Sequence, residues 1–115
     1  MQQIKEEAQF RSVINGSVPV VAVFKAVWCK DCHYIEPFMP DLIHQYEGRL
    51  EFVHVDRDDL PDLCAELNIL GIPSFIVFRE GQEITRFVSK LRKTREEIEE
   101  FLDRSLQVAD ALGKN

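Results

Sequence analysis

Residues 28–33 read Trp28-Cys29-Lys30-Asp31-Cys32-His33, and this short stretch admits three kinds of chemistry. The two cysteines can interconvert between dithiol and disulfide, or they can supply half of a zinc site. With His33 added, they match the CxxCH pattern at which c-type haem is attached. We therefore use the residues on either side of the stretch to distinguish among these three chemistries.

The neighbouring residues predict a buried strand before the stretch and a long helix after it. The run from Val20 to Ala26 is rich in β-branched residues and apolar on both faces, which suits a strand covered on both sides. Apolar residues then recur at helical intervals up to Gly48, at Ile35, Phe38, Met39, Leu42, Ile43 and Tyr46. Pro37 and Pro40 are expected to bend this helix or to split it.

The rest of the chain alternates between strands and helices. Further strands are predicted at Gln2–Ile4, Leu50–Val55, Ser74–Phe78 and Glu83–Val88, and Glu80-Gly81 joins the last two into a hairpin. Further helices are predicted from about Glu6 to Ile14, from Pro61 to Leu67, and from Thr94, which can form a capping box with Glu97. This order predicts an α/β fold with a central mixed sheet of four to five strands, flanked by helices on both faces.

Length and charge narrow the function classes. A chain of 115 residues suits a single domain over residues 1–115, with 111–115 expected to be a frayed tail. The net charge of −6 argues against nucleic acid or an anionic membrane as a partner. The first residues contain no apolar signal segment, so we expect a cytoplasmic location, where a disulfide is usually transient and catalytic.

The zinc and haem readings find little support in the rest of the chain. A structural zinc site needs four ligands, and the remaining Cys64, His44 and His54 show no paired spacing, so no metal site is expected. Covalent haem attachment is typical of exported helical proteins rather than of a strand–helix alternation. Cys64 falls on the apolar face of its helix and is read as a core residue.

The position of the CxxC pair favours thiol–disulfide exchange. Cys29 would lie at the start of a helix, where unpaired backbone N–H groups and the helix dipole stabilise a thiolate. Cys32, one turn further along, would then be close enough to attack a mixed disulfide formed at Cys29. The sequence therefore predicts Cys29 as the nucleophile and Cys32 as the resolving thiol.

The strand and motif VAVFKAVWCKDC, the later GIPSF and the hairpin that follows resemble the thioredoxin family across nearly the whole chain. The resemblance implies a thioredoxin fold and a cis peptide bond before Pro73, which faces the first cysteine. It also implies a substrate groove lined by Trp28, Ile72 and Pro73, with Val88-Ser89-Lys90 as its third wall.

The chain departs from the usual pattern of that family at three places. Lys30-Asp31 stand where Gly-Pro is common between the cysteines, and we interpret Lys30, Asp31 and His33 as residues that tune the dithiol. Val23 stands where the family holds a buried aspartate that assists proton transfer, so Asp31, Glu36 or water must accept the proton of Cys32. Ser89-Lys90 replace a common glycine and can place positive charge beside the groove.

The function expected from these observations is that of a cytosolic reductase of protein or small-molecule disulfides, cycling between dithiol and disulfide at Cys29 and Cys32. The resemblance implies that electrons come from NADPH through a thioredoxin reductase, so no bound cofactor is needed. Disulfide-containing proteins and this reductase are the expected partners, and the chain is expected to be a monomer. The alternative is a thioredoxin-fold binding or redox-sensing module with one dedicated partner.

Overall fold

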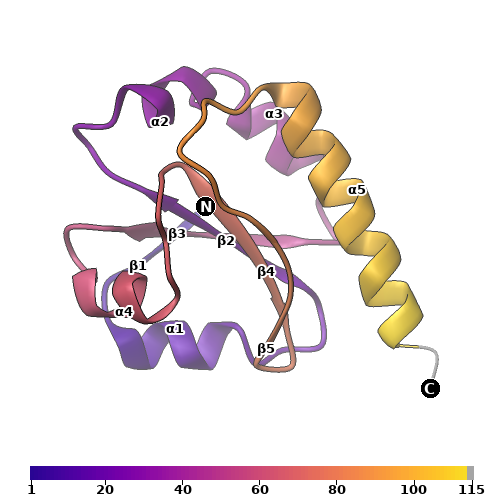
Figure 1. The fold of residues 1–115 in the computed structure, drawn as a ribbon. Helices are drawn as coiled ribbons and strands as arrows, with labels where there is room; N and C mark the ends of the chain where they lie inside the picture. The colour runs from indigo at the N-terminus through magenta and orange to yellow at the C-terminus, as the bar shows by residue number, and fades with distance from the viewer. Residues whose placement is uncertain (114–115) are drawn as a thin grey trace.

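Strand β2 lies at the centre of a five-stranded mixed sheet in the computed structural model, which describes residues 1–113 (Figure 1). The strand order is β1-β3-β2-β4-β5; β1, β3 and β2 are parallel, and β4 and β5 are antiparallel to their neighbours. The strands are β1 (Gln2–Ile4), β2 (Val20–Lys25), β3 (Glu51–Asp56), β4 (Ser74–Arg79) and β5 (Gln82–Phe87). The predicted mixed sheet is confirmed.

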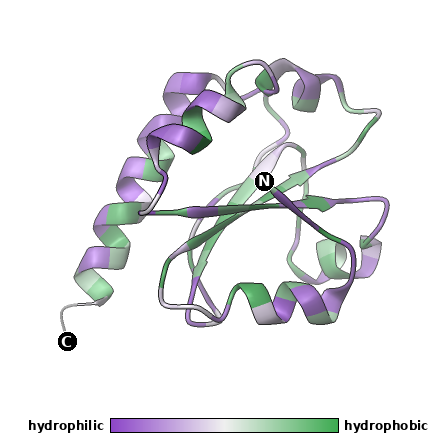
Figure 2. Cartoon of the chain, turned by 180° about the vertical axis from the view of Figure 1, so that it is seen from behind, coloured by the Kyte–Doolittle hydropathy of each residue, from purple (hydrophilic) through white to green (hydrophobic). Residues whose placement is uncertain are grey.

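Helices cover both faces of the sheet because β2 is apolar on both of its faces. Ala22 and Phe24 pack toward α1 (Glu7–Val13) and α4 (Pro61–Glu66), and Val21 and Val23 pack toward α3 (Met39–Gln45) and α5 (Arg95–Leu112). Figure 1 shows these two helix layers on opposite sides of the strands, and Figure 2 shows strands that are mostly hydrophobic beside helices with one polar face. Alternating side chains along one strand thus build two separate cores.

The long helix expected after the CxxC pair is split in two. Helix α2 (Lys30–Ile35) ends just before Pro37, and α3 begins at Met39 with Pro40 in its first turn. A proline is tolerated in a first turn because its missing N–H would have no partner there. The split leaves α2 as a short separate helix that carries Lys30 to Cys32 at the carboxyl end of β2.

The C-terminal part follows the predicted turns and caps. Glu80 and Gly81 both have positive φ, at 53° and 82°, as a tight hairpin turn requires. Thr94 and Glu97 form the capping box at the start of α5. The helix continues through Leu112, so the frayed tail expected from residue 111 is helical over its first two residues, and residues 114–115 lie outside the described part. Within residues 1–113, none of the helices combines the length and apolar character needed to cross a membrane.

Candidate active site

Cys29 caps the first turn of α2 and points its sulfur at two backbone groups. The backbone N–H of Cys32 donates to Cys29 Sγ at 3.2 Å, and the Cys29 thiol donates to the carbonyl oxygen of Ile72 at 3.6 Å. Cys29 is 7% exposed and Cys32 is 1% exposed, so Cys29 is the thiol nearer to solvent. These two contacts and its greater exposure hold the Cys29 sulfur at the accessible side of the pair.

Cys32 is held as a neutral thiol. Burial raises the pKa of its thiol from 9.0 to about 12, with a further contribution from the adjacent Cys29 sulfur. The Ala26 backbone and the positive charge of Lys25 oppose this rise only in part. The two cysteines therefore differ in the way that a nucleophile and a resolving thiol must differ, because only an accessible thiolate attacks a substrate.

The loop before β4 forms the wall opposite Cys29. The Ile72–Pro73 peptide bond is cis, as the resemblance implied, and Ile72 presents its carbonyl oxygen to the Cys29 thiol. Gly71 lies directly against the loop after β5, since a Cβ atom built on it would be 2.2 Å from the carbonyl oxygen of Ser89. Ser89 thus lies against the residue that precedes Ile72, and the third wall that the resemblance implied stays a prediction.

The rim of the site exposes apolar side chains. Trp28 is 62% exposed, and its indole Nε1 donates to a carboxylate oxygen of Asp58 at 2.9 Å, which fixes the ring beside Cys29. Val27, Leu70 and Leu91 are also largely exposed, although each is a large apolar residue. Exposed apolar residues gathered near a reactive group are typical of a binding surface.

Asp31 has a partner that sequence reasoning missed. Arg92 Nε donates to Asp31 Oδ1 at 2.9 Å, and the Arg92 guanidinium lies 4.5 Å from the centre of the Tyr34 ring. The pair ties the loop between β5 and α5 to the first turns of α2. No local motif signals it, because the two residues are 61 positions apart.

Lys93 is a second basic residue at the site, and it is fully buried. Its ammonium donates to the carbonyl oxygens of Ser89 at 3.1 Å and Leu91 at 3.2 Å, and it lies 5.1 Å from the centre of the Phe87 ring. Burial lowers the pKa of Lys93, and the negative charge of Asp31 opposes this effect only in part. The backbone of its own loop thus satisfies a charge that is out of contact with solvent.

His33 makes its polar contacts with a backbone carbonyl oxygen and a carboxylate. Its Nε2 donates to the carbonyl oxygen of Val27 at 2.6 Å, and its Nδ1 lies 3.2 Å from Glu36 Oε1. The hydrogen bond to Val27 raises the pKa of the imidazole, and Glu36 adds to the effect. His33 therefore braces the turn before α2, and Glu36 is engaged by it on the solvent side.

The buried position where an aspartate is common in the family is apolar here. Val23 is fully buried and pairs in register with His54 of β3, whose imidazole pKa is lowered by burial. Cys64 belongs to α4 and is buried in the core, which confirms the prediction that it is a core residue, and burial raises the pKa of its thiol. No group of three or more potential metal ligands occurs in the part of the chain that the structure describes.

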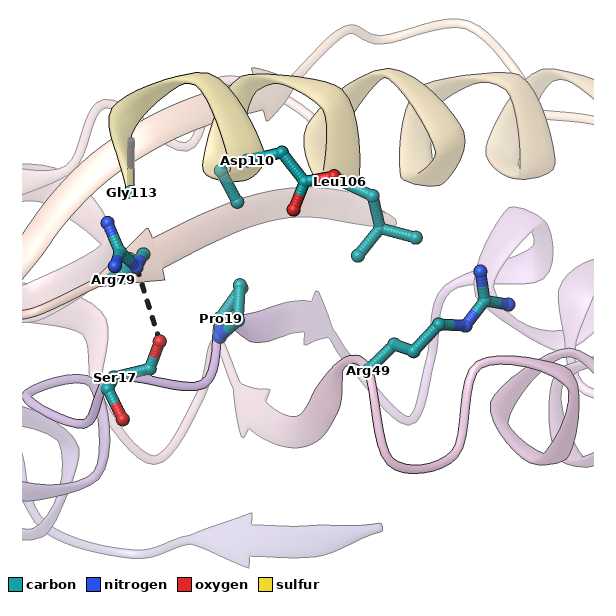
Figure 3. Close-up of a pocket in the computed structure, with 8 residues that line it drawn as sticks. Ser17, Pro19, Arg49, Arg79, Leu106, Asp110 and Gly113 are labelled. Atoms are coloured by element: carbon teal, nitrogen blue, oxygen red, sulfur yellow. Dashed lines mark hydrogen bonds between the residues drawn. The ribbon is translucent and has the colours of Figure 1, made fainter. Parts of the chain in front are cut away.

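A hollow of about 530 Å³ lies at the other end of the sheet (Figure 3). Its lining includes Pro19, which precedes β2, whereas Cys29 follows that strand. Figure 3 shows the hydrogen bond that Arg79 donates to the backbone carbonyl oxygen of Ser17. Leu106 and Asp110 of α5 also line the hollow. None of the three cysteines lines this hollow.

Comparison with known proteins identifies the same family as the geometry. The thioredoxin family model matches residues 1–104. Thioredoxin X of Arabidopsis thaliana, a chloroplastic protein, is 36% identical over 103 residues, which are 87% of this chain and 57% of that relative. A thioredoxin from Staphylococcus aureus is 33% identical over 100 residues, which cover 87% of this chain and 93% of the relative.

Solved structures agree on the fold. The thioredoxin of Plasmodium falciparum superposes with a TM-score of 0.81 at 23% identity, covering 90% of this chain and 98% of that one. The thioredoxin of Fasciola hepatica gives a TM-score of 0.80 at 25% identity, covering 91% of this chain and 99% of that one.

Proposed function

This chain belongs to the thioredoxin family and is a thiol–disulfide oxidoreductase, and from that premise we propose that it reduces disulfides in the cytosol by cycling between a Cys29/Cys32 dithiol and disulfide. The observation that carries the proposal is the difference between the two thiols. Cys29 receives an N–H hydrogen bond at the rim of the site, and Cys32 is buried as a neutral thiol behind it.

The cycle moves two electrons from the chain to its substrate. The Cys29 thiolate attacks one sulfur of the substrate disulfide, the substrate S–S bond breaks, and the departing sulfur takes a proton. Cys32 then loses its proton and attacks Cys29 Sγ, which releases the second substrate thiol and leaves a Cys29–Cys32 disulfide. An external dithiol must reduce that disulfide, and a thioredoxin reductase-like donor supplied by NADPH fits this role without a bound cofactor.

The groove beside Cys29 is proposed to hold the substrate. Ile72 and Pro73 would present backbone groups to an extended segment that carries the disulfide, and Trp28 and Ser89 would form the flanking walls. The exposed indole of Trp28 and the position of Ser89 against Gly71 support this arrangement. Because the groove is already formed, little conformational entropy is lost when a substrate binds in it.

The proton of Cys32 needs an acceptor other than a buried aspartate. We propose Asp31, with Glu36 or water as the alternatives. The Asp31→Asn variant tests this assignment through the pH profile of mixed-disulfide resolution. Loss of the acidic limb of that profile supports Asp31, and an unchanged profile excludes it.

Reduction of insulin disulfides tests the overall activity. With dithiothreitol as donor, the chain should accelerate insulin reduction, and Cys29→Ser should abolish the acceleration; an inactive wild-type chain would refute the reductase role. The Cys32→Ser variant should trap substrates as mixed disulfides. The reduction potential of the pair adds an independent check, because a value near roughly −270 mV indicates a reductase and one near about −120 mV an oxidant.

A further inference from the structure

The loop of residues 89–93, which joins β5 to α5, is fixed at three places. Its carbonyl oxygens at Ser89 and Leu91 accept hydrogen bonds from the buried Lys93 ammonium. Its backbone at Ser89 lies so close to Gly71 that a side chain at position 71 would not fit. Arg92 pairs with Asp31 and stacks on Tyr34. Two of the three basic residues of this loop are therefore used to hold its shape.

Lys90 is the basic residue of the loop that remains available. It is exposed, and it makes no ion pair or side-chain hydrogen bond with any residue of 1–113. Its Cα would lie 2.8 Å from a Cβ built on Gly71, which places it beside the Ile72–Pro73 wall of the groove. Lys30, next to Cys29, is likewise exposed and unpaired within the described residues. Two free ammonium groups thus flank the site.

Three carboxylates of this region already have basic partners. Asp31 pairs with Arg92, whereas Asp58 accepts a hydrogen bond from the neutral Trp28 indole and keeps its negative charge. Asp59 pairs with Lys5, and Glu36 with His33. A chain with a net charge of −6 therefore presents free positive charge at its reactive groove. Local charge of this kind attracts opposite charge at short range and sets partner choice more than affinity.

We propose that Lys90, with Lys30, selects protein disulfides whose flanking residues are acidic. This inference rests on the proposed reductase function and adds a substrate preference to it. The fixed loop holds Lys90 beside the segment that binds along Ile72 and Pro73, so a glutamate or aspartate near the attacked cysteine meets an ammonium group. The exposed Leu91 on the same loop adds apolar contact for a neighbouring residue.

The test uses three synthetic peptides, each closed by one disulfide and differing only in whether the flanking residues are glutamate, lysine or serine. The reduced chain is mixed with each peptide, and the rate of peptide reduction is measured by chromatography of acid-quenched samples. At low salt the glutamate peptide should be reduced faster than the lysine peptide by about fivefold, the factor that about 1 kcal/mol of charge interaction gives. The ratio should fall toward one as salt shortens the screening length.

The variant Lys90→Glu should lower the glutamate-to-lysine rate ratio by about fivefold or more, since it removes one attraction and adds a repulsion. The matched control is Arg104→Glu, which changes the net charge equally at an exposed position of α5 remote from the groove, where Arg104 pairs with Glu100. The control should leave the ratio unchanged. A wild-type ratio of one or less, or an equal loss in both variants, overturns the inference alone, because the serine peptide is still reduced. Failure to reduce the serine peptide overturns the reductase function, and the inference with it.

Discussion

The Cys32 thiol should remain largely protonated at neutral pH even when Cys29 is absent. Its pKa of about 12 instead of 9.0 leaves a thiolate fraction of roughly 10⁻⁵ at pH 7, against about 10⁻² for an unperturbed thiol. The three-unit difference corresponds to about 4 kcal/mol. Burial is the main cause and the Cys29 sulfur is the second, so Cys29→Ser should lower the pKa of Cys32 without bringing it back to 9.0.

The measurement needs Cys32 as the sole titrating thiol, so Cys29→Ser is combined with Cys64→Ala, which leaves one of the three cysteines. Thiolate absorbance and the rate of alkylation are followed against pH. The Cys64→Ala single variant is the control for the small core change. A Cys32 pKa at or below 9.0 in a folded protein would refute the reasoning, because it would show that burial is not the dominant cause.

Three further predictions concern the contacts around the site. Gly71→Ala should lower the free energy of unfolding by about 1–3 kcal/mol and slow peptide reduction, because the added Cβ would clash with the Ser89 backbone. Denaturant titrations and rate assays measure the two effects. The control Gly16→Ala should show neither effect, because its Cβ would enter open space. Arg92→Met should slow alkylation of Cys29 at pH 7, because it leaves the Asp31 carboxylate without its ion-pair partner; the effect should be at most about fivefold, the limit for an exposed ion pair. A second change, Asp31→Asn, should restore the rate. If the rate is not restored, Arg92 does not act through Asp31. Thr94→Ala should lower the free energy of unfolding, measured by denaturant titration, by about 0.5–2 kcal/mol, because it removes the capping box of α5. A smaller loss would show that α5 is stabilised by its packing alone.

Local patterns predicted most of the elements, and the reason is physical. The run from Val20 to Lys25 can only be a covered strand, Thr94 and Glu97 satisfy the first N–H groups of a helix within one turn, and Glu80-Gly81 supplies the positive φ of a tight hairpin. Each of these signals depends on neighbours in the sequence. The position of Cys29 at a helix start was predicted for the same reason.

Local sequence patterns could not predict the electrostatic partners of the site residues. Asp31 meets Arg92 and Trp28 meets Asp58 only after β5 and β3 have taken their places in the sheet. Lysines are rarely buried, and Lys93 can be buried only because two backbone carbonyl oxygens of the folded loop accept hydrogen bonds from its ammonium. Pairs of this kind need a folded chain to be recognised.

These partners determine the net electrostatic effect of Lys30 and Asp31 on the two cysteines. From the sequence, the two side chains have opposite effects on a neighbouring thiolate, and their sum has no obvious sign. In the structure, the carboxylate of Asp31 is neutralised by Arg92, whereas Lys30 keeps its charge unpaired among the described residues. The balance is therefore positive, and we expect it to stabilise the thiolate and hence the dithiol form. Since a more stable dithiol is harder to oxidise, the loop that holds Arg92 contributes to how strongly this chain reduces its substrates.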